Sequence, residues 1–451
     1  MATKKELIEA QGYSRRRLLS AFIGGAPGGK ELEPAQPLRA VIAGIALTAM
    51  VLIGGVFYGL LRPGLPDDWG NNRLILASDT GARYVSIKNT LYPVINTASA
   101  RLMIEPSEFE VITTDQATLE GKKIGATLGI LGAPDSLPTP KLLINDGWTA
   151  CRSDEQTSIA ISNQVQGLAT DDSTVVKVGD SLYVVTGEMR YRVDASQEAP
   201  ILRALGLSTI AAMEVDGNWL NLFTEGADLE PIVVPNAGER ITGTDLEIGS
   251  VVNPQGTDDL FLITNGAELA PLSPIAYQLY LLGTGQTLGD AREASASVLA
   301  ALPNAKPAGG ADWPTDALTP LETDGNTCAL LTHVDGEART VLATLRDDSR
   351  EDDRKIGVVV ERGHGSLVYT GNPSSRFAYL VDESGTAYAI PAVDDDVLAR
   401  LGFTAKDLDQ VTAPWLAFLA VGPALDKEAA MQTPKASASA GSGSGSGSGS
   451  K

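Results

Sequence analysis

The longest apolar stretch of the chain runs from Ala40 to Leu61, between Arg39 and Arg62, and carries no charge. At about 1.5 Å per residue, a helix over this stretch is about 33 Å long, enough to cross a bilayer core of roughly 30 Å. A helix in a water-soluble protein is seldom apolar on every face. The pattern therefore predicts one transmembrane helix over residues 40–61.

Beyond the span, apolar and polar residues alternate in short runs typical of β-strands. Four strand-turn-strand patterns recur, at residues 83–95, 182–193, 260–272 and 378–391. The aromatic of the first strand precedes its counterpart by eight residues in three patterns and by nine in the last. Such spacing favours hairpins with short turns, here at Lys88-Asn89, Gly187, Asn265-Gly266 and Ser384-Gly385.

Three of these patterns continue into leucines spaced three apart and followed by glycine, at residues 202–206, 279–283 and 398–402. The spacing predicts one face of a helix, and the glycine predicts its C-cap. Each unit is therefore expected to be strand, turn, strand, helix. The first unit is degenerate, because Ala98 to Leu102 lacks the glycine.

The units start at uneven intervals, which excludes a solenoid of fixed period. Cys151 and Cys328 lie in two long insertions between units. We expect an extracytoplasmic α+β, β-rich, elongated domain of four degenerate repeats around a central body. The expected ranges are arm 1–39, span 40–61, linker 62–72, first repeat 73–115, first central segment 116–171, second repeat 172–210, connecting segment 211–248, third repeat 249–290, second central segment 291–355, fourth repeat 356–413, C-terminal segment 414–432 and disordered low-complexity tail 433–451.

Charge divides unequally across the span. The arm carries seven basic and four acidic residues; taking these from the chain's 35 and 56 leaves 28 basic and 52 acidic residues elsewhere. Basic residues flanking a span stay on the cytoplasmic side, so a single-pass cell-membrane protein with the arm inside and the large domain outside is predicted. The acidic outer domain argues against binding to nucleic acid.

Ser14 to Leu19, with Arg15, Arg16 and Arg17, is similar to a twin-arginine export signal. Twenty residues separate Leu19 from Ala40, however, and the apolar run exceeds an ordinary signal core. No small-residue cleavage site precedes Arg62, so an uncleaved anchor is the preferred interpretation. Gly55 and Gly59 fit a small-xxx-small packing face within it.

The two cysteines both fall on the predicted outer side, where a disulfide can persist. A bond between Cys151 and Cys328 would bring the two insertions together as one central body. Two free buried thiols are the alternative. With two cysteines and two histidines in the chain, a zinc site of usual ligand types is not expected.

Gly24 to Lys30 has the spacing of a P-loop. Glu31 stands where the magnesium-binding Ser or Thr belongs, and no strand precedes the glycines. A flexible linker is therefore preferred, and no nucleotide, metal or other cofactor is predicted.

Three further groups are candidate sites. His364 with Ser366 suggests a catalytic pair, but the flanking strand-like runs favour a hairpin turn. His333 is expected at a strand end beside a turn. Asp394 to Asp396 resembles a cation site, yet it precedes a helix whose N-terminus acidic residues stabilise. We predict no catalytic residue.

In this order along the chain, several stretches resemble the EccB family, a membrane component of the actinobacterial type VII (ESX) secretion system. They are Leu91-Tyr92-Pro93-Val94 with Ser99-Ala100-Arg101-Leu102, Gly132-Ala133-Pro134, Trp148-Thr149-Ala150-Cys151, Tyr388-Ala389-Ile390-Pro391, and Pro414-Trp415 with Gly422-Pro423. The short basic arm, single span, four repeats and one cysteine in each of two insertions also agree. The resemblance covers the chain to about Met431.

The resemblance implies partners: an FtsK/SpoIIIE-type ATPase (EccC) docked on the arm, EccD and EccE in the membrane, and a mycosin protease outside. Within the arm, Arg15, Arg16 and Arg17 are the expected docking residues, although their closeness to Gly12-Tyr13 departs from the family pattern. Some family members are described as ATPases. Two functions remain: a structural subunit of the secretion complex, including self-association of the external domain, or a cell-surface enzyme or wall glycan-binding module acting alone.

Overall fold

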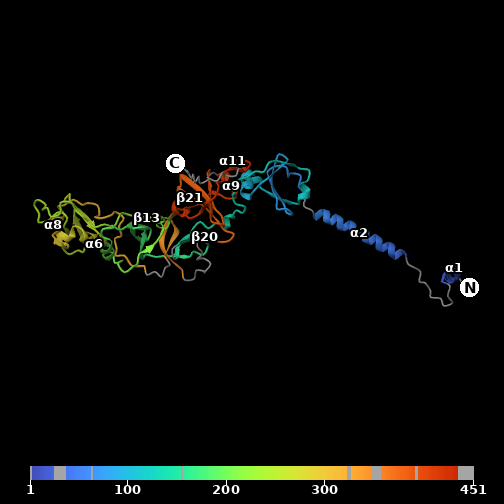
Figure 1. Ribbon diagram of the computed structural model, residues 1–451, viewed down its shortest axis with the longest axis horizontal. Coiled ribbons are helices and arrows are strands. Elements are labelled where there is room, and N and C mark those ends of the chain that lie inside the picture. Colours follow the sequence, from blue (N-terminus) through green and yellow to red (C-terminus); the bar gives the residue numbers. More distant parts are fainter. Residues whose placement is uncertain are drawn as a thin grey trace, which may run out of the picture. The chain divides into compact units, whose positions relative to one another are not determined.

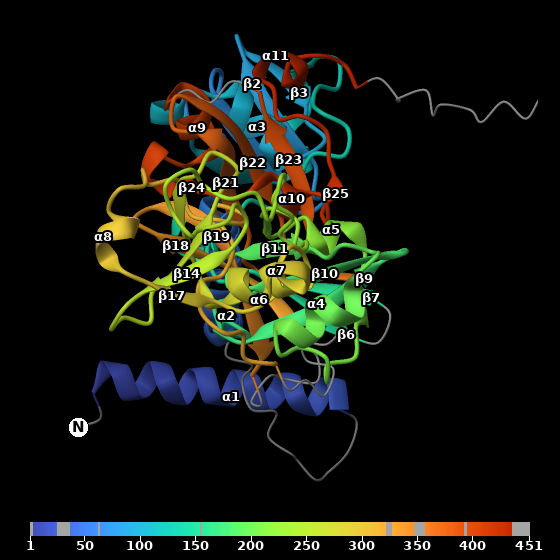
Figure 2. The same ribbon diagram turned by 90° about the vertical axis from the view of Figure 1, so that its left-hand side faces the viewer.

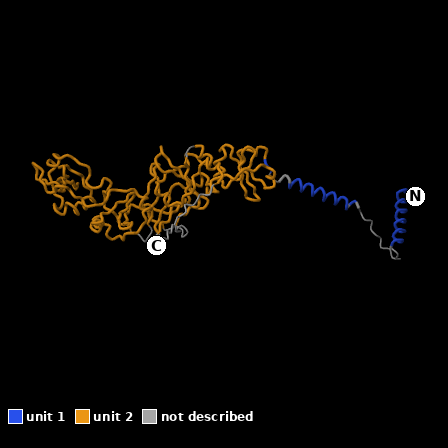
Figure 3. The backbone as a smooth tube through the Cα atoms, turned by 45° about the horizontal axis from the view of Figure 1, so that its top comes forward, with its two compact units in different colours: residues 1–65 blue, residues 66–451 orange. Residues whose placement is uncertain are grey.

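The computed structural model describes residues 3–24, 37–61, 64–153, 156–321, 327–346, 357–391 and 395–434. The chain divides into two compact units, residues 1–65 and 66–451 (Figure 3). The stretch that resembles a P-loop, beyond Gly24, and most of the expected low-complexity tail lie outside the described residues.

The first unit contains two helices, α1 (Lys4–Gly24) and α2 (Pro37–Leu61) (Figure 1). Within α2, Ala40–Tyr58 is the one segment of the described residues long and apolar enough to cross a membrane. Pro37 begins the helix, a position where proline is tolerated because the first amides have no helical partner. The predicted apolar helix is therefore present.

The described residues of the second unit form five β-sheets. The first sheet has the order β4-β1-β2-β3-β5. Its segments are β1 (Arg73–Ala77), β2 (Arg83–Ile87), β3 (Thr90–Pro93), α3 (Thr97–Met103), η1 (Pro106–Glu108), β4 (Val111–Thr114), η2 (Gln116–Leu119) and β5 (Lys123–Ile124).

The second sheet, β12-β9-β10-β11-β13, and the third, β16-β15-β14-β17, follow. The second comprises β9 (Ser173–Val178), β10 (Ser181–Thr186), β11 (Met189–Arg192), α4 (Glu198–Ala204), β12 (Met213–Glu214), α5 (Gly217–Leu220) and β13 (Thr224–Glu225). The third comprises β14 (Val251–Pro254), β15 (Leu260–Ile263), β16 (Leu269–Leu272), α6 (Pro274–Leu282), α7 (Gly285–Leu288), β17 (Arg292–Ala294) and α8 (Ala296–Leu299).

The fourth sheet, β24-β21-β22-β23-β25, closes the described chain. It comprises β21 (Ser366–Asn372), β22 (Ser375–Val381), β23 (Thr386–Ile390), α9 (Asp395–Leu401), η5 (Ala405–Asp407), β24 (Asp409–Gln410), α10 (Ala413–Leu416), β25 (Ala420–Val421) and α11 (Lys427–Ala430). The central sheet, β20-β7-β6-β18-β19-β8, comprises β6 (Thr149–Ser153), β7 (Gln156–Ile161), β8 (Gly167–Ala169), β18 (Thr327–Val334), β19 (Glu337–Leu345) and β20 (Gly357–Val360), with η3 (Pro140–Leu142) before it.

The first, second and fourth sheets share one pairing order. Three antiparallel strands form the middle, and a short parallel strand flanks each side. The third sheet has the same order, except that its last position is an isolated parallel bridge between Leu269 and Asn304. Each hairpin expected from sequence is present, but with one further antiparallel strand before it and parallel strands after its helix.

These additional strands extend the sheets past the ranges expected from sequence. For example, β5 pairs with β3 although residues 116–171 were expected in the central body. Likewise β12 and β13 belong to the second sheet although residues 211–248 were expected to be a connecting segment. Strands of two residues carry no periodicity that a sequence pattern could reveal.

The predicted turns and glycine helix caps are present, and their backbone angles differ from the usual ones only in the third sheet. Gly206 and Gly402 have positive φ at helix ends, as a glycine C-cap requires. Gly283 is the C-cap of α6, as predicted, although its φ of −109° lies outside the left-handed region. The third hairpin turns around Asn265-Gly266, as predicted, and the residue in the left-handed region is Ala267.

A tyrosine lies over a glycine in the three sheets that have both parallel edge strands. Cβ atoms added to Gly125, Gly226 and Gly422 would overlap the rings of Tyr92, Tyr191 and Tyr388, respectively. Each glycine N–H also donates to the strand that carries the tyrosine. In the third sheet the corresponding residues are Ala270 and Ala305, with the same backbone bond from Ala305. In the third sheet, where Ala270 replaces the tyrosine, Ala305 can therefore carry a Cβ atom in place of glycine.

Clusters of buried side chains connect each sheet to its neighbours. Leu102 and Leu398 share a cluster between the first and fourth sheets, with α3 beside α9 and α11 (Figure 2). The central sheet shares a second cluster with the fourth and second sheets, and the second and third share another. The first and last sheets of the unit therefore pack together, and the central sheet lies between them and the second sheet.

We predict that Gly422→Ala destabilises the fourth sheet, because the added methyl group must displace the buried Tyr388 ring. Overpacking of this kind costs about 1–3 kcal/mol. The measurement is thermal unfolding of the detergent-solubilised protein. Gly217→Ala is the matched control, since a Cβ there meets nothing within 4 Å at the start of a helix. Equal melting temperatures for the two variants would contradict the packing argument.

Candidate functional site

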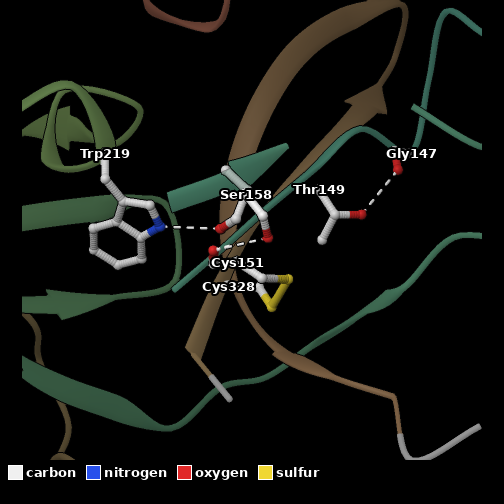
Figure 4. Close-up of a disulfide and its surroundings, with 7 residues drawn as sticks. Gly147, Thr149, Cys151, Ser158, Trp219 and Cys328 are labelled. Atoms are coloured by element: carbon white, nitrogen blue, oxygen red, sulfur yellow. Dashed lines mark hydrogen bonds between the residues drawn. A yellow bond between two sulfur atoms is a disulfide. The ribbon is translucent and has the colours of Figure 1, made fainter. Parts of the chain in front are cut away.

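The centre of the second unit is a junction where two distant segments form one sheet. Strands β6 and β18 are antiparallel, with Cys328 directly opposite Cys151. The two cysteines form a disulfide across 177 residues of sequence (Figure 4). Both cysteines are buried, and Ser158 Oγ donates to the carbonyl O of Cys151 at 3.4 Å. The two insertions thus form one body, as expected from the sequence.

Three tryptophans surround this junction, and each is 0 % exposed. Trp148 precedes β6 and donates to the carbonyl O of Ile144 at 2.9 Å. Trp219, from the second sheet, donates to the carbonyl O of Ala150 at 3.0 Å (Figure 4). Buried indole N–H groups need such partners, because an unpaired one costs the full desolvation penalty.

Trp415 comes from the fourth sheet and donates to Thr340 Oγ1 on β19 at 2.9 Å. Its ring meets that of Trp148 edge-on, with centroids 6.2 Å apart. The central sheet is therefore held to the second sheet by one tryptophan and to the fourth by another. Buried aromatic pairs of this geometry add about 0.5–1.5 kcal/mol beyond their buried area.

Trp219 and Trp415 occupy the same place in their two sheets. Each stands three residues after the N-cap of the short helix between the parallel edge strands, at Asp216 and Thr412. The first sheet has Thr118 at this position, and the third has Val298. Only the two sheets that pack on the central sheet carry tryptophan there, so this position distinguishes them.

A buried arginine connects the fourth sheet to the first. Arg400 of α9, with its side chain 2 % exposed, donates to Glu105 at 2.6 Å, to Asp396 at 2.8 Å and to the carbonyl O of Ile104 at 2.9 Å. The Arg400 hydrogen bond lowers the pKa of Asp396, which Lys427 also approaches. Burial alone would lower the pKa of Arg400, but its carboxylate partners raise it overall.

Of the two described residues of the acidic run that resembles a cation site, Asp396 belongs to this Arg400 clamp. Asp395 and Asp396 are the first residues of α9, where their charge stabilises the helix N-terminus. Asp396 pairs with Arg400 and Lys427. Asp394 lies outside the described residues. Among the described residues no group of three His, Cys, Asp or Glu side chains could hold a metal ion.

His364 and Ser366 do not form the arrangement of a base and a nucleophile. Ser366 is fully buried and its Oγ donates to the carbonyl O of Ile144. His364 contacts Asn163 through Nε2 at 3.0 Å and the carbonyl O of Arg362 through Nδ1 at 3.1 Å. Ser366 therefore links the start of β21 to the loop before β6, and His364 links the segment between β20 and β21 to Asn163.

The predicted hairpin around His364 is wrong. The flanking strands exist, but β20 pairs in parallel with β7 of the central sheet, and β21 belongs to the fourth sheet. The residues between them form a crossover from one sheet to the other. Nearby, Glu361 accepts from the N–H of Asn163 at 2.8 Å, which lowers the pKa of its carboxyl.

His333 lies one residue before the end of β18, beside the turn at Asp335-Gly336, as predicted. Its Nδ1 is 3.1 Å from Asp146, and its Nε2 is 2.7 Å from the carbonyl O of Gln410. Gln410 belongs to β24, so His333 contributes a further polar contact between the central and fourth sheets.

The remaining predicted residues lie in the first unit. Arg15, Arg16 and Arg17 are on α1, and Gly55 is on α2, where a Cβ would meet nothing within 4 Å. Gly59 is on the same helix, one turn after Gly55. A shallow groove of about 430 Å³ runs along α2, lined by Val41, Gly44, Ile45, Thr48, Ala49 and Leu52.

Sequence reasoning missed the tryptophan positions and the Arg400 clamp. Trp148 and Trp415 fall in stretches that resemble a family, but no pattern indicates that they touch. For Arg400, the available signal is an acidic residue four positions earlier on a helix, a common surface pair. Its burial depends on the first sheet, about 295 residues away in sequence.

Comparison with known proteins gives one family and several relatives. The family model described as type VII secretion system ESX-1, transport TM domain B, matches residues 1–438. The ESX-3 secretion system ATPase EccB3 of Mycolicibacterium smegmatis is 24% identical over 441 residues, covering 87% of this chain and 83% of the relative. The ESX-5 secretion system ATPase EccB5 of Mycobacterium tuberculosis is 25% identical over 461 residues, covering 89% and 88%.

Two solved structures are similar in fold. A chain of an intact ESX-5 inner membrane complex has a TM-score of 0.62 at 21% identity, covering 96% of this chain and 95% of that one. The EccB3 dimer from an ESX-3 core complex has a TM-score of 0.65 at 21% identity, covering 80% and 99%. At this identity the likeness establishes a shared fold.

We predict that Cys151→Ser abolishes a faster-migrating species on non-reducing gels and lowers stability. For a closed loop of 177 residues, the chain-entropy estimate is about 5 kcal/mol, an upper value because residual structure in the unfolded chain reduces it. Gel mobility and urea unfolding measure the two effects. The variant with both cysteines changed to serine is the control for a newly freed thiol. Identical mobility with and without reductant in the unmodified protein would exclude the bond.

Proposed function

The chain belongs to the EccB family of type VII secretion system proteins, and from this premise we propose that it is a structural membrane subunit of an ESX secretion core complex. One observation carries the proposal: the family match extends over residues 1–438, so that it includes the arm, the apolar helix and the external sheets together. The similar solved chains come from ESX inner membrane assemblies.

We propose that the first, second, third and fourth sheets are four degenerate copies of one unit around the bridged central sheet, in an elongated domain. Their common pairing order and the recurrent tyrosine-glycine contact support this. The matched exchange of both residues to alanine in the third sheet fits divergence from a common unit, because a ring and a Cβ cannot share that space.

The orientation follows from charge. We propose that the arm is cytoplasmic and that residues from about 62 onward are extracytoplasmic, since the arm has an excess of basic residues and the rest a large excess of acidic ones. The disulfide supports the same orientation, because such bonds persist outside the reducing cytoplasm.

The apolar helix offers one face for packing against other spans. Gly44 and Thr48 lie in the groove on α2, and at 3.6 residues per turn Gly55 and Gly59 continue on the same side. Small residues let helix backbones approach closely in a bilayer, where van der Waals contact drives association. We propose that this face, including Gly55 and Gly59, contacts a neighbouring transmembrane helix.

Partners are proposed from family membership. They are an FtsK/SpoIIIE-type ATPase (EccC) bound through the arm at Arg15, Arg16 and Arg17, EccD and EccE in the membrane, a mycosin protease outside, and a second copy of the external domain. The EccB3 dimer and the ESX-5 assembly are precedents among the similar structures. We propose no catalytic activity, although relatives are named ATPases, because Glu31 replaces the magnesium-binding residue of a P-loop.

The function predicts co-purification. Extracted from its native membrane in mild detergent, the tagged full-length chain should migrate with several other membrane proteins in one large complex, identified by mass spectrometry. A variant with Gly55→Leu and Gly59→Leu should lose partners if the α2 face packs against them, whereas Ala46→Leu, on the opposite side of the helix, should not. A solitary monomer with hydrolytic activity would argue for the surface-enzyme alternative.

The orientation predicts opposite accessibility of the two ends. Cysteines placed one at a time at Thr3 and at Thr433 should react differently with a membrane-impermeant maleimide in intact cells, Thr433 being labelled and Thr3 protected until lysis. The native cysteines are engaged in the disulfide, so they do not compete for the reagent. Labelling of both positions, or of neither, in intact cells would refute a single crossing.

A further inference from the structure

Helix α1 gathers its large apolar residues on one side. At about 100° per residue, all its large aliphatic residues and Phe22 fall within an arc of about 160°. These residues are Leu7, Ile8, Leu18, Leu19, Phe22 and Ile23. The opposite arc carries Glu6, Glu9, Arg16 and Arg17, with Tyr13 and Ser20. Such a division calls for an apolar surface on one side of the helix and water on the other.

The apolar residues are concentrated at the C-terminal end of α1. Leu18, Leu19, Phe22 and Ile23 occupy the last two turns and are between 53% and 92% exposed. Earlier in the helix, Lys4, Gln11 and Arg15 lie within the apolar arc, and Lys5 lies at its edge. The last two turns are thus the segment suited to an apolar environment, and the three arginines lie one turn before them.

This end of α1 is also the end tethered to the membrane helix. Twelve residues join Gly24 to Pro37 of α2, a reach of at most about 47 Å even when fully extended. The bilayer that α2 crosses is therefore always within reach of the exposed apolar turns. A tethered surface competes effectively with partners free in solution, because its effective concentration is high.

The charge of α1 matches an anionic surface. The helix carries Lys4, Lys5 and the three arginines against Glu6 and Glu9. Basic residues beside an apolar helix face are attracted to acidic headgroups, over a range set by the Debye length. Arg15 lies within the apolar arc, and its long stem allows the guanidinium to reach headgroup phosphates from there.

We propose that α1 lies on the surface of the membrane that α2 crosses, with its last two turns among the acyl chains and with Arg15 and Arg16 among the phosphates of anionic lipids. The proposal rests on the membrane placement of α2 in the proposed function, but not on the secretion role. In this position Arg17 and the two glutamates face water, which leaves one side of α1 free for a protein partner.

The test uses the full-length protein in liposomes, with one spin label at a time. Phe22→Cys places the label on the apolar arc, and Ser20→Cys, two residues earlier, places the matched control on the polar arc. The native cysteines are disulfide-bonded and do not react. Collision with oxygen, which concentrates in lipid, and with a water-soluble nickel chelate measures the depth of each label.

In liposomes of equal phosphatidylglycerol and phosphatidylcholine, the label at 22 should show a several-fold higher oxygen-to-nickel collision ratio than the label at 20. In pure phosphatidylcholine this difference should shrink. The combined change Arg15→Gln, Arg16→Gln and Arg17→Gln, which keeps good helix formers, should also reduce it. Co-purification with membrane subunits is measured separately, so failure of the two proposals can be distinguished.

Three results would overturn the proposal. Equal, water-like collision ratios at both positions would place α1 in solution. Protection of the label at 22 from both reagents would indicate burial in a second copy of the chain. A lipid-like ratio at 22 that neither lipid charge nor the arginines affect would exclude anionic headgroups as the partner.

Discussion

The pairing of β6 with β18 is the constraint on which the second unit depends. The cysteines that these strands carry are 177 residues apart, and the contact of the strands determines which segments share the central sheet. The disulfide restricts the conformations open to the unfolded chain, which favours the folded state in which these strands pair. Because the central sheet contacts both the second and the fourth sheets, an error in this register would misplace both of them.

The four similar sheets can occupy different positions because a few residues differ between them. The short helices α5 and α10 present tryptophan to the central sheet, where the first and third sheets have Thr118 and Val298. Each indole combines a large apolar area with one hydrogen bond of fixed direction, so that it specifies an orientation as well as adding stability. The Arg400 clamp performs a comparable role between the fourth and first sheets, using charge in a buried site.

The structural subunit that we propose would act through its surfaces. The polar groups that suggested catalysis, His364 and Ser366, are engaged with backbone carbonyls or with Asn163, and they stabilise the crossover between two sheets. The first unit differs from this region, because its exposed surface is largely apolar. There, large apolar side chains are exposed on two helices, which is favourable only where lipid or another apolar surface covers them.

The sequence alone determined the apolar helix, the four hairpins and most of their turns, because these depend on the order of residues within about a dozen positions. It also indicated the family, from motifs arranged along the whole chain. Tertiary structure decided the short parallel edge strands, the crossover at His364 and the burial of Arg400. It also decided which two sheets meet the central one. The edge strands pair with strands roughly 30 to 40 residues away, and the contact of Arg400 with the first sheet spans 295 residues. Two-residue strands or a single arginine carry no periodic signal of such partners.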